Sequence, residues 1–223
     1  MKRTFEEIIA AHTKPVVFAS TAAAKPATIN RARSATETEN VIRASPPYTS
    51  VFFTDGSCEG NPGPCGAGMV GCLPLCTPKA DRMLQVARTV MGTTHDPSLG
   101  TYVEQKLALG FGTNNIAELH AIELALDCIL QNSCAQPAVR IFTDSLYSIG
   151  VLTKNWKATK NVALVHGIKA KWAIVKKKAG GDASIHWCKG HVGIGWNELA
   201  DRLADATAQR ARTMKADEPS ILF

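Results

Sequence analysis

The sequence predicts an α/β domain, and three observations carry the prediction. Short β-rich apolar runs bounded by turn residues recur along the chain, and stretches of helical periodicity separate the later runs from one another. Apolar residues make up 45% of the chain and charged residues 20%, which is the composition of a globular protein and not of a disordered one. With 223 residues, the chain can form one sizeable core or one domain with an extra arm.

Composition also bounds the partners and the compartment. The formal net charge of +6 is compatible with a polyanionic partner, although the charge alone is weak evidence. No apolar run approaches the roughly 20 residues that cross a bilayer, so we expect no membrane partner. The seven cysteines form no Cys-x2-Cys pair, which speaks against a zinc ribbon and favours reduced thiols in an intracellular protein.

The N-terminal part of the chain has a different composition from the rest. Residues 1–49 contain no Trp and no Gly, and residues 20–46 are expected to be disordered or weakly structured. A flexible linker is favoured over an organelle transit peptide, because glutamates interrupt the Ala-, Ser- and Arg-rich stretch. The predicted organisation is a flexible extension at 1–47, one domain at 48–213 and a C-terminal tail at 214–223.

Three β-rich runs lie in the first half of the domain, at 51–54, 66–73 and 102–110. The first run leads directly into Asp55-Gly56-Ser57, and a Gly- and Pro-rich turn at 60–64 precedes the second. Because no long helix separates the three runs, they predict an antiparallel meander. Residues 74–100 are expected to form an irregular excursion with a short helix.

The next segments add two carboxylates, Glu118 and Asp144, to Asp55. Apolar residues repeat at helical spacing over 116–130, and Glu118 lies at the edge of the apolar stripe, where a buried carboxylate needs a partner. A fourth strand at 139–143 ends in Thr-Asp at Asp144, as the first strand does at Asp55. Each acid alone is typical of a turn or a helix start, but the three together favour a hard cation such as Mg2+ or Mn2+.

The last third of the domain is basic and then glycine-rich. Residues 140–178 carry nine Lys or Arg against Asp144 alone, which is typical either of a solvated helix face or of a phosphate-tracking patch. A fifth strand is expected at 184–188. It is followed by a mobile loop that carries His191 and by a helix from about residue 197 that carries Asp201. In isolation, His191 is typical of a solvated loop and Asp201 of a surface acid.

Four motifs in order resemble those of type 1 ribonuclease H, over roughly residues 48–212. They are Thr54-Asp55-Gly56-Ser57-Cys58-x-Gly60-Asn61-Pro62-Gly63-Pro64, Thr113-Asn114-Asn115-x-x-Glu118-Leu119, Thr143-Asp144-Ser145 and Lys189-Gly190-His191-x-Gly193-x-x-x-Asn197-Glu198-x-x-Asp201. The resemblance implies a ribonuclease H-like fold, with a five-stranded mixed sheet whose strands 1–3 are antiparallel and with helices on both faces.

The resemblance also implies an activity. It is the endonucleolytic hydrolysis of the RNA strand of RNA–DNA hybrids, which leaves 5′-phosphate and 3′-hydroxyl ends. The alternative is a catalytically silent nucleic-acid-binding or assembly module on the same fold. Such modules commonly lose a carboxylate, whereas all four are present here, so the enzyme is favoured.

By the same resemblance, Asp55, Glu118, Asp144 and Asp201 hold two Mg2+ ions, for which Mn2+ can substitute. Asp55 bridges the ions, Asp201 lies on the nucleophile side, and Glu118 and Asp144 lie on the leaving-group side. His191 assists proton movement or product release. The residues implied to read the 2′-hydroxyls in the minor groove are Gly56, Ser57, Cys58, Asn61, Asn114 and Asn115, and Thr113 contacts a DNA-strand phosphate.

The sequence departs from the family pattern in three places. The connection at 71–112 is longer than usual, and Leu146 replaces a polar groove-contacting residue. The chain after Trp156 is short and lacks the full extra helix and basic loop of the kind that many bacterial and vertebrate members carry. The motifs are also similar to ribonuclease H domains of retroelement reverse transcriptases, so a reverse transcriptase or replication partner is an alternative to a free-standing enzyme. We expect a monomer that acts on RNA–DNA hybrids in the cytoplasm or nucleus, with the mitochondrion as the alternative.

Overall fold

The computed structural model describes residues 35–132, 137–213 and 220–222. The described strands are β1 (Thr49–Cys58), β2 (Gly63–Leu73), β3 (Thr101–Gly112), β4 (Ala138–Thr143), β5 (Ala183–Trp187) and β6 (Ser220–Leu222). The described helices are α2 (Ala35–Arg43), α3 (Arg82–Thr89), α4 (Asn114–Gln131), α5 (Leu146–Thr153), α6 (Val162–Lys178) and α7 (Gly195–Ala211), with a short 3-10 helix η1 (Pro97–Leu99). No helix in these ranges is long and apolar enough to cross a membrane.

One mixed sheet organises the domain, with strand order β5-β4-β1-β2-β3-β6. Strands β1, β2 and β3 are antiparallel, whereas β1 pairs in parallel with β4, and β4 with β5. The predicted five-stranded mixed sheet with an antiparallel meander is therefore confirmed. A short sixth strand, β6, forms from three residues of the predicted tail and pairs with β3.

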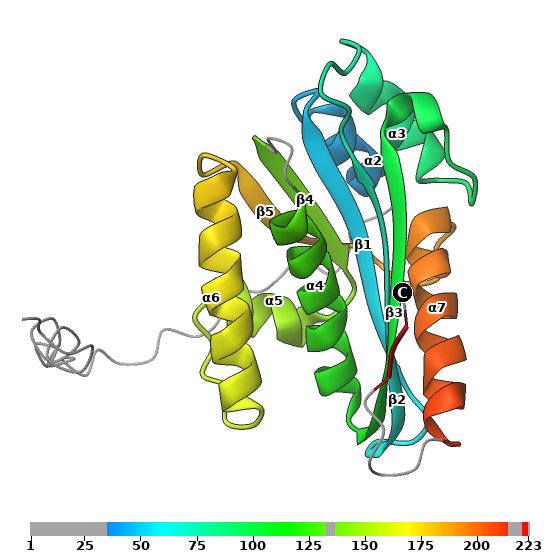
Figure 1. Ribbon diagram of the computed structural model, residues 1–223, viewed down its shortest axis with the longest axis vertical. Helices are drawn as coiled ribbons and strands as arrows, with labels where there is room; N and C mark the ends of the chain where they lie inside the picture. Colours follow the sequence, from blue (N-terminus) through cyan, green and yellow to red (C-terminus); the bar gives the residue numbers. More distant parts are fainter. Residues whose placement is uncertain (1–34, 133–136, 214–219, 223) are drawn as a thin grey trace, which may run out of the picture. The chain divides into compact units, whose positions relative to one another are not determined.

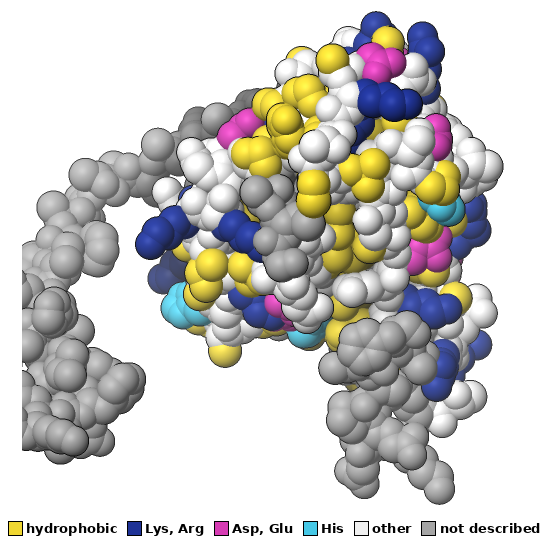
Figure 2. All heavy atoms as spheres, turned by 45° about the horizontal axis from the view of Figure 1, so that its top comes forward, with side chains coloured by type: hydrophobic (Ala, Val, Ile, Leu, Met, Phe, Trp, Pro, Cys, Tyr) yellow, Lys and Arg dark blue, Asp and Glu magenta, His cyan; other side chains and the backbone are white. Residues whose placement is uncertain are grey.

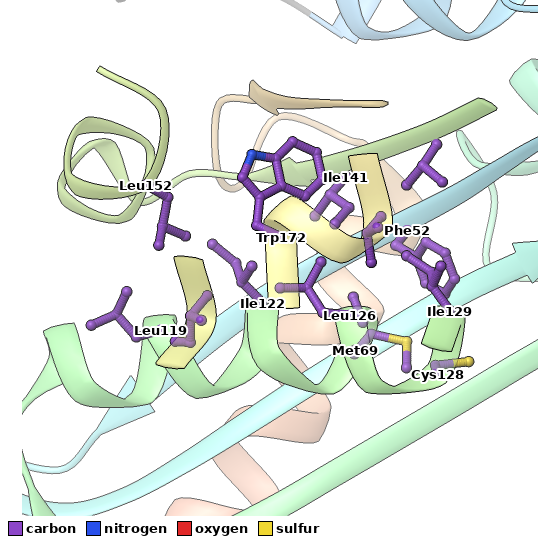
Figure 3. Close-up of a cluster of buried hydrophobic side chains, with 14 of the residues drawn as sticks. Phe52, Met69, Leu119, Ile122, Leu126, Cys128, Ile129, Ile141, Leu152 and Trp172 are labelled. Carbon is purple, nitrogen blue, oxygen red and sulfur yellow. The ribbon is translucent and has the colours of Figure 1, made fainter. Parts of the chain in front are cut away.

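Helices cover both faces of the sheet, as predicted (Figure 1). Phe52 and Phe53 are neighbours on β1, and because side chains alternate along a strand, they enter opposite cores. Phe52 belongs to the same buried cluster as Ile122 of α4 and Trp172 of α6, and Figure 3 draws this cluster. Phe53 packs with Trp196 of α7 in the second core, with which α2 and α3 also pack. Strand β1 is thus held from both sides.

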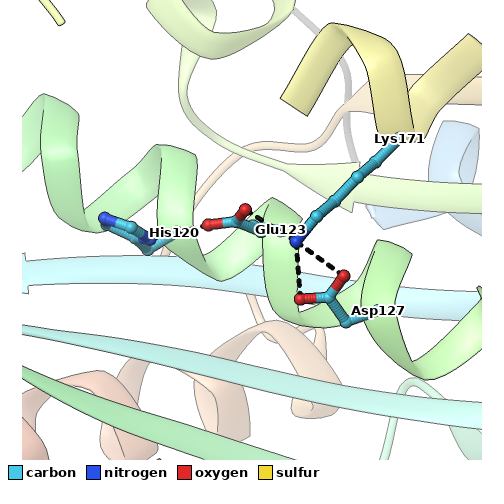
Figure 4. Close-up of polar contacts among 4 residues, drawn as sticks. All are labelled: His120, Glu123, Asp127 and Lys171. Carbon is cyan, nitrogen blue, oxygen red and sulfur yellow. Dashed lines mark hydrogen bonds and ion pairs between the residues drawn. The ribbon is translucent and has the colours of Figure 1, made fainter. Parts of the chain in front are cut away.

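An ion-pair network fastens α4 to α6 on the first face (Figure 4). The Lys171 ammonium lies 2.7 Å from the carboxylates of both Glu123 and Asp127, and Glu123 also accepts from His120 at 2.9 Å. These contacts hold the pKa of Glu123 at about 2, mainly through the hydrogen bond from His120. The acidic side chains of Glu123 and Asp127 therefore form a helix–helix contact and not a second acidic site.

The structure differs from the prediction at the N-terminal side. Part of the segment expected to be disordered or weakly structured, 20–46, forms helix α2, whose Thr38 and Ile42 are buried. The helix is ordered because Ile42 joins Met83 and Val86 of α3 in the second core. The rest of the predicted extension, residues 1–34, lies outside the described residues, and the domain boundaries themselves stay predictions.

The excursion between β2 and β3 contains a helix, as expected, and it is anchored by a buried arginine. Arg82 is 1% exposed and donates to the carbonyls of Pro47 at 2.8 Å, Thr49 at 2.7 Å and Leu99. Three carbonyl acceptors offset the cost of burying this charge.

Figure 2 shows basic, acidic and hydrophobic side chains intermixed on the face of the molecule that it presents.

Candidate active site

The parallel pairing of β1 and β4 brings two aspartates together. Thr54 lies opposite Thr143 in the register. Asp55 and Asp144, the next residue after each threonine, therefore lie at the same level of the sheet. Strand β4 ends at Thr143, as predicted, but β1 continues through Asp55 to Cys58 because β2 keeps pairing with it. Asp55 is thus held inside a strand and Asp144 directly after one.

A glycine lets the third carboxylate approach. A Cβ on Gly56 would lie 2.2 Å from the backbone nitrogen of Glu118, so only a residue without a side chain allows α4 to lie this close to β1. Glu118, the fifth residue of α4, is consequently carried to a position beside Asp55. The Gly56 amide also donates to Asp55 Oδ1 at 2.7 Å, which fixes that carboxylate.

Asp55, Glu118 and Asp144 form one cluster in which ligand oxygens lie within 4.8 Å of one another. Asp55 is 7% exposed and Glu118 4%, and Glu118 Oε2 has no hydrogen-bond partner among the described residues. Burial and the neighbouring Asp144 raise the pKa of Asp55 to about 8. Burial, followed by Asp55, raises the pKa of Glu118 well above its usual value. Such a cluster fits a hard divalent cation, which would offset the repulsion and supply Oε2 with a partner.

The remaining two predicted catalytic residues flank the cluster. Asp201 lies on α7, and its charge contributes to the raised pKa of Asp55. Burial and then Asp205 raise the pKa of Asp201 itself. His191 is largely exposed, and its Nδ1 lies 3.9 Å from Asp201 Oδ2. The described structure therefore groups three carboxylates tightly and places the fourth, with the histidine, at the side.

The residues predicted to bind substrate share the same end of the sheet. Gly56, Ser57 and Cys58 end β1, Asn61 lies in the following turn, and Thr113, Asn114 and Asn115 begin α4. The backbone N–H of Asn114 donates to Asn61 Oδ1 at 3.3 Å, which joins the two segments. The side chain of Asn114 also forms a hydrogen bond with Glu118, which lowers the pKa of that glutamate. The Cys58 and Cys65 thiols lie 2.6 Å apart across the β1–β2 pair.

Sequence reasoning missed a fifth carboxylate, Asp205. Its Oδ1 accepts a hydrogen bond from the Ser57 hydroxyl at 2.5 Å, and its charge raises the pKa of both Asp55 and Asp201. The available signal was its spacing of four residues from Asp201, which places both acids on one face of a helix. Asp205 thus connects α7 to the end of β1.

Comparison with known proteins agrees with this arrangement. The ribonuclease H family model matches residues 47–209. This chain belongs to the ribonuclease H family. It is 32% identical over 170 residues to a ribonuclease H of Ruthia magnifica, covering 73% of this chain and 97% of that protein. It is 33% identical over 167 residues to a ribonuclease H of Vibrio campbellii, and the match covers 71% of this chain and 88% of that protein.

Solved structures of the family share the fold. The N-terminal RNase H domain of a Mycobacterium tuberculosis protein, solved as a fusion with maltose-binding protein, superposes with a TM-score of 0.53 at 21% identity, over 74% of this chain and 96% of that one. LC11-RNase H1, solved in complex with an RNA/DNA hybrid, superposes with a TM-score of 0.51 at 20% identity, over 74% of this chain and 99% of that one. The predicted family resemblance and fold are therefore confirmed.

The raised pKa of Asp55 predicts the pH dependence of stability without divalent cations. Between the ordinary value of 3.8 and about 8, folded Asp55 keeps a proton that the unfolded chain releases, so the free energy of unfolding should fall as pH rises. The slope from this group is at most about 1.4 kcal/mol per pH unit. Denaturant unfolding in EDTA between pH 5 and 9 measures it.

Asp55→Asn should flatten this dependence and stabilise the cation-free protein above pH 8. Asp81→Asn, at an exposed position before α3, is the matched control and should leave the slope unchanged. A slope that is the same in wild type and Asp55→Asn would contradict the assignment.

Proposed function

We propose that this protein is a type 1 ribonuclease H, an endoribonuclease that hydrolyses the RNA strand of RNA–DNA hybrids to 5′-phosphate and 3′-hydroxyl products. The carboxylate cluster of Asp55, Glu118 and Asp144 is the observation that carries the proposal. Membership of the ribonuclease H family, which is a family of nucleases, and the solved hybrid complex of LC11-RNase H1 support it.

Two divalent cations, Mg2+ or Mn2+, would be held by Asp55, Glu118, Asp144 and Asp201, and when bound they make water a better nucleophile and stabilise the leaving 3′ oxygen. Asp55 would contribute to both cation positions, because it clusters with Glu118 and Asp144 and also lies close enough to Asp201 for that charge to raise its pKa. Its bond from the Gly56 amide keeps one oxygen fixed. His191, exposed beside Asp201, would accept or donate a proton during turnover or product release.

Recognition of the hybrid would rest on the edge formed by the end of β1 and the start of α4. Asn61 and Asn114 are joined there by a hydrogen bond, and both present polar groups that can meet 2′-hydroxyls in a minor groove. Thr113 begins α4 and would contact a DNA-strand phosphate. Because these contacts read sugar and shape, little sequence preference is expected.

A catalytically silent module is the second candidate, and the intact carboxylate set speaks against it. A partner reverse transcriptase, the monomeric state and the cytoplasmic, nuclear or mitochondrial location stay predictions.

The first test is cleavage by the full chain. With Mg2+ or Mn2+, the protein should nick the RNA strand of a labelled hybrid and spare duplex DNA of the same sequence, because the 2′-hydroxyl is the recognised group. Gel analysis with end-group mapping measures products and ends. Equal cutting of duplex DNA would contradict the substrate assignment. No cutting of either the hybrid or the duplex DNA would favour the silent module.

Substitutions separate the roles of the acids and the histidine. Asp55→Asn and Asp144→Asn should each lower kcat by more than about tenfold, or 1.4 kcal/mol of barrier, because they remove charge that holds the cations. His191→Ala should slow turnover less, since the acids remain. Asp81→Asn again serves as the control. An Asp55→Asn enzyme that keeps more than about a tenth of the wild-type rate would contradict its central role.

The basic connection between α5 and α6 predicts phosphate contacts. Lys154, Lys157 and Lys160 are exposed there, and replacing all three with Ala should weaken hybrid binding and flatten its salt dependence by up to about 0.9 log unit per contact. The kcat at saturating hybrid should change little. Binding measured across a salt series tests this expectation.

The control for that experiment is the double change Lys176→Ala and Lys177→Ala, on exposed positions of α6. Lys178 is left intact because its ammonium donates to the carbonyls of Ile129 and Asn132 at the end of α4. If the triple variant and the control show the same salt slope as wild type, the patch is an ordinary solvated surface.

A further inference from the structure

The excursion between β2 and β3, residues 74–100, contributes no residue to the carboxylate cluster, yet it is tightly built into the domain. It contains α3 and η1, and in Figure 1 α3 lies above the start of α7, the helix that carries Asp201. The contacts between these two helix ends point to a role.

Helix α7 begins without a side-chain cap. The N-cap residue is Ile194, and no side-chain cap bond is found there in the described structure. The first backbone N–H groups of a helix have no partner within the helix and need acceptors from elsewhere. Here Gly195 donates to the carbonyl of Met91 at 3.3 Å and Trp196 to that of Val90 at 3.1 Å.

Those carbonyls lie directly after α3, which ends at Thr89, with Val90 as its C-cap residue. The end of α3 therefore caps the start of α7, and each helix supplies the groups that the other lacks. The partial negative charge at a helix C-terminus also meets the partial positive charge at a helix N-terminus, which favours this end-to-end contact.

The contact leaves no space for a side chain. A Cβ on Gly195 would lie 1.9 Å from the carbonyl oxygen of Gly92, about 1.5 Å closer than ordinary van der Waals contact. Next to it, Trp196 is 1% exposed, and its indole N–H donates to the carbonyl of Thr94 at 3.5 Å. The ring of Trp196 also packs edge-on against Tyr102 at the start of β3.

The other side of the excursion is tied to β1. Arg82, the first residue of α3, donates to the carbonyls of Pro47 and Thr49, where β1 begins. The excursion thus connects the strand that carries Asp55 to the helix that carries Asp201. Asp201 follows Gly195 by six residues, which is about 9 Å along a helix axis, so a shift at the helix start is transmitted to it.

We propose that the excursion is a positioning element for the active site, and that Gly195 is its positioning residue. By capping α7 from α3, it sets where Asp201 lies relative to Asp55. The inference rests on the proposed function for the role of Asp201. A misplacement of about 1 Å in a catalytic group can cost about 100-fold in rate, so the closeness of this contact matters.

Gly195→Ala in the full chain tests the proposal against two matched glycines. A Cβ on Gly92, across the same contact, would meet only Thr89 O at 3.7 Å, and one on Gly167 in α6 would meet nothing within 4 Å. Alanine is a better helix former than glycine, so Gly195→Ala should not weaken α7 through helix propensity.

The expected result is a kinetic split. Gly195→Ala should lower kcat at least about tenfold at fixed Mg2+ and leave KM for the hybrid within about twofold, because the Asn61 and Asn114 edge is untouched. The rise in Tm on adding Mg2+ or Mn2+ should shrink, since cation binding at a displaced Asp201 is weaker. Gly92→Ala and Gly167→Ala should behave as wild type in all three measurements.

The outcomes separate this inference from the proposed function. A wild-type enzyme that does not cut hybrids overturns the function, and the cation-induced Tm shift still decides the positioning role. If wild type cuts hybrids and Gly195→Ala matches Gly92→Ala in kcat and in the cation response, the positioning role is wrong. A lower Tm with an unchanged cation response would overturn it equally, because the contact would then be only structural.

Amide hydrogen exchange of the wild type covers the case in which Gly195→Ala does not fold. The amides of Gly195 and Trp196 should exchange more slowly than those of Val162 and Ala163, which begin α6 at an N-cap that also lacks a side-chain bond. Equal exchange in the two helices, measured in EDTA, would show that α3 does not hold α7 and would overturn the proposal.

Discussion

Like-charged carboxylates buried at one edge of the sheet set the constraint on which the rest of the structure depends. Asp55 and Glu118 are almost completely buried beside Asp144, and this raises the pKa of both. Each pKa unit of such a shift is about 1.4 kcal/mol against the ionised cluster. Core packing must offset this cost, and a bound cation relieves it, so the site is stable only on a scaffold that cannot relax away from it.

Strand β1 meets that requirement because it is surrounded on every side. It pairs with β4 on one edge and β2 on the other, while Phe52 and Phe53 anchor it in two separate cores. Gly56 then allows α4 to lie against the strand, which brings Glu118 to Asp55. Three of the acids are therefore positioned by β1, β4 and α4, all of which contribute side chains to the buried cores.

What could be predicted from the sequence was local. Alternating apolar runs, the helical period around Glu118 and the two Thr-Asp strand ends each carry their signal within a few residues, and they located the sheet and the acids. Helix α2 was not predicted because Ile42 is buried in a core formed by distant segments, among them α3, about 40 residues further on. Asp205 was not predicted as a site residue because its hydrogen-bond partner, Ser57, lies on a different element.

The fourth acid has a different kind of support. Asp201 is more exposed than Asp55 and Glu118, and its helix follows a loop in which His191 and Gly193 both take left-handed backbone conformations. That loop offers α7 no side-chain cap, so the helix start takes its hydrogen bonds from the carbonyls that follow α3. Backbone-to-backbone contacts of this kind leave no pattern of side-chain types, which is why the excursion reads as an irregular insertion. Its longer chain is the means by which a helix on the second face keeps a fixed relation to a strand in the middle of the sheet.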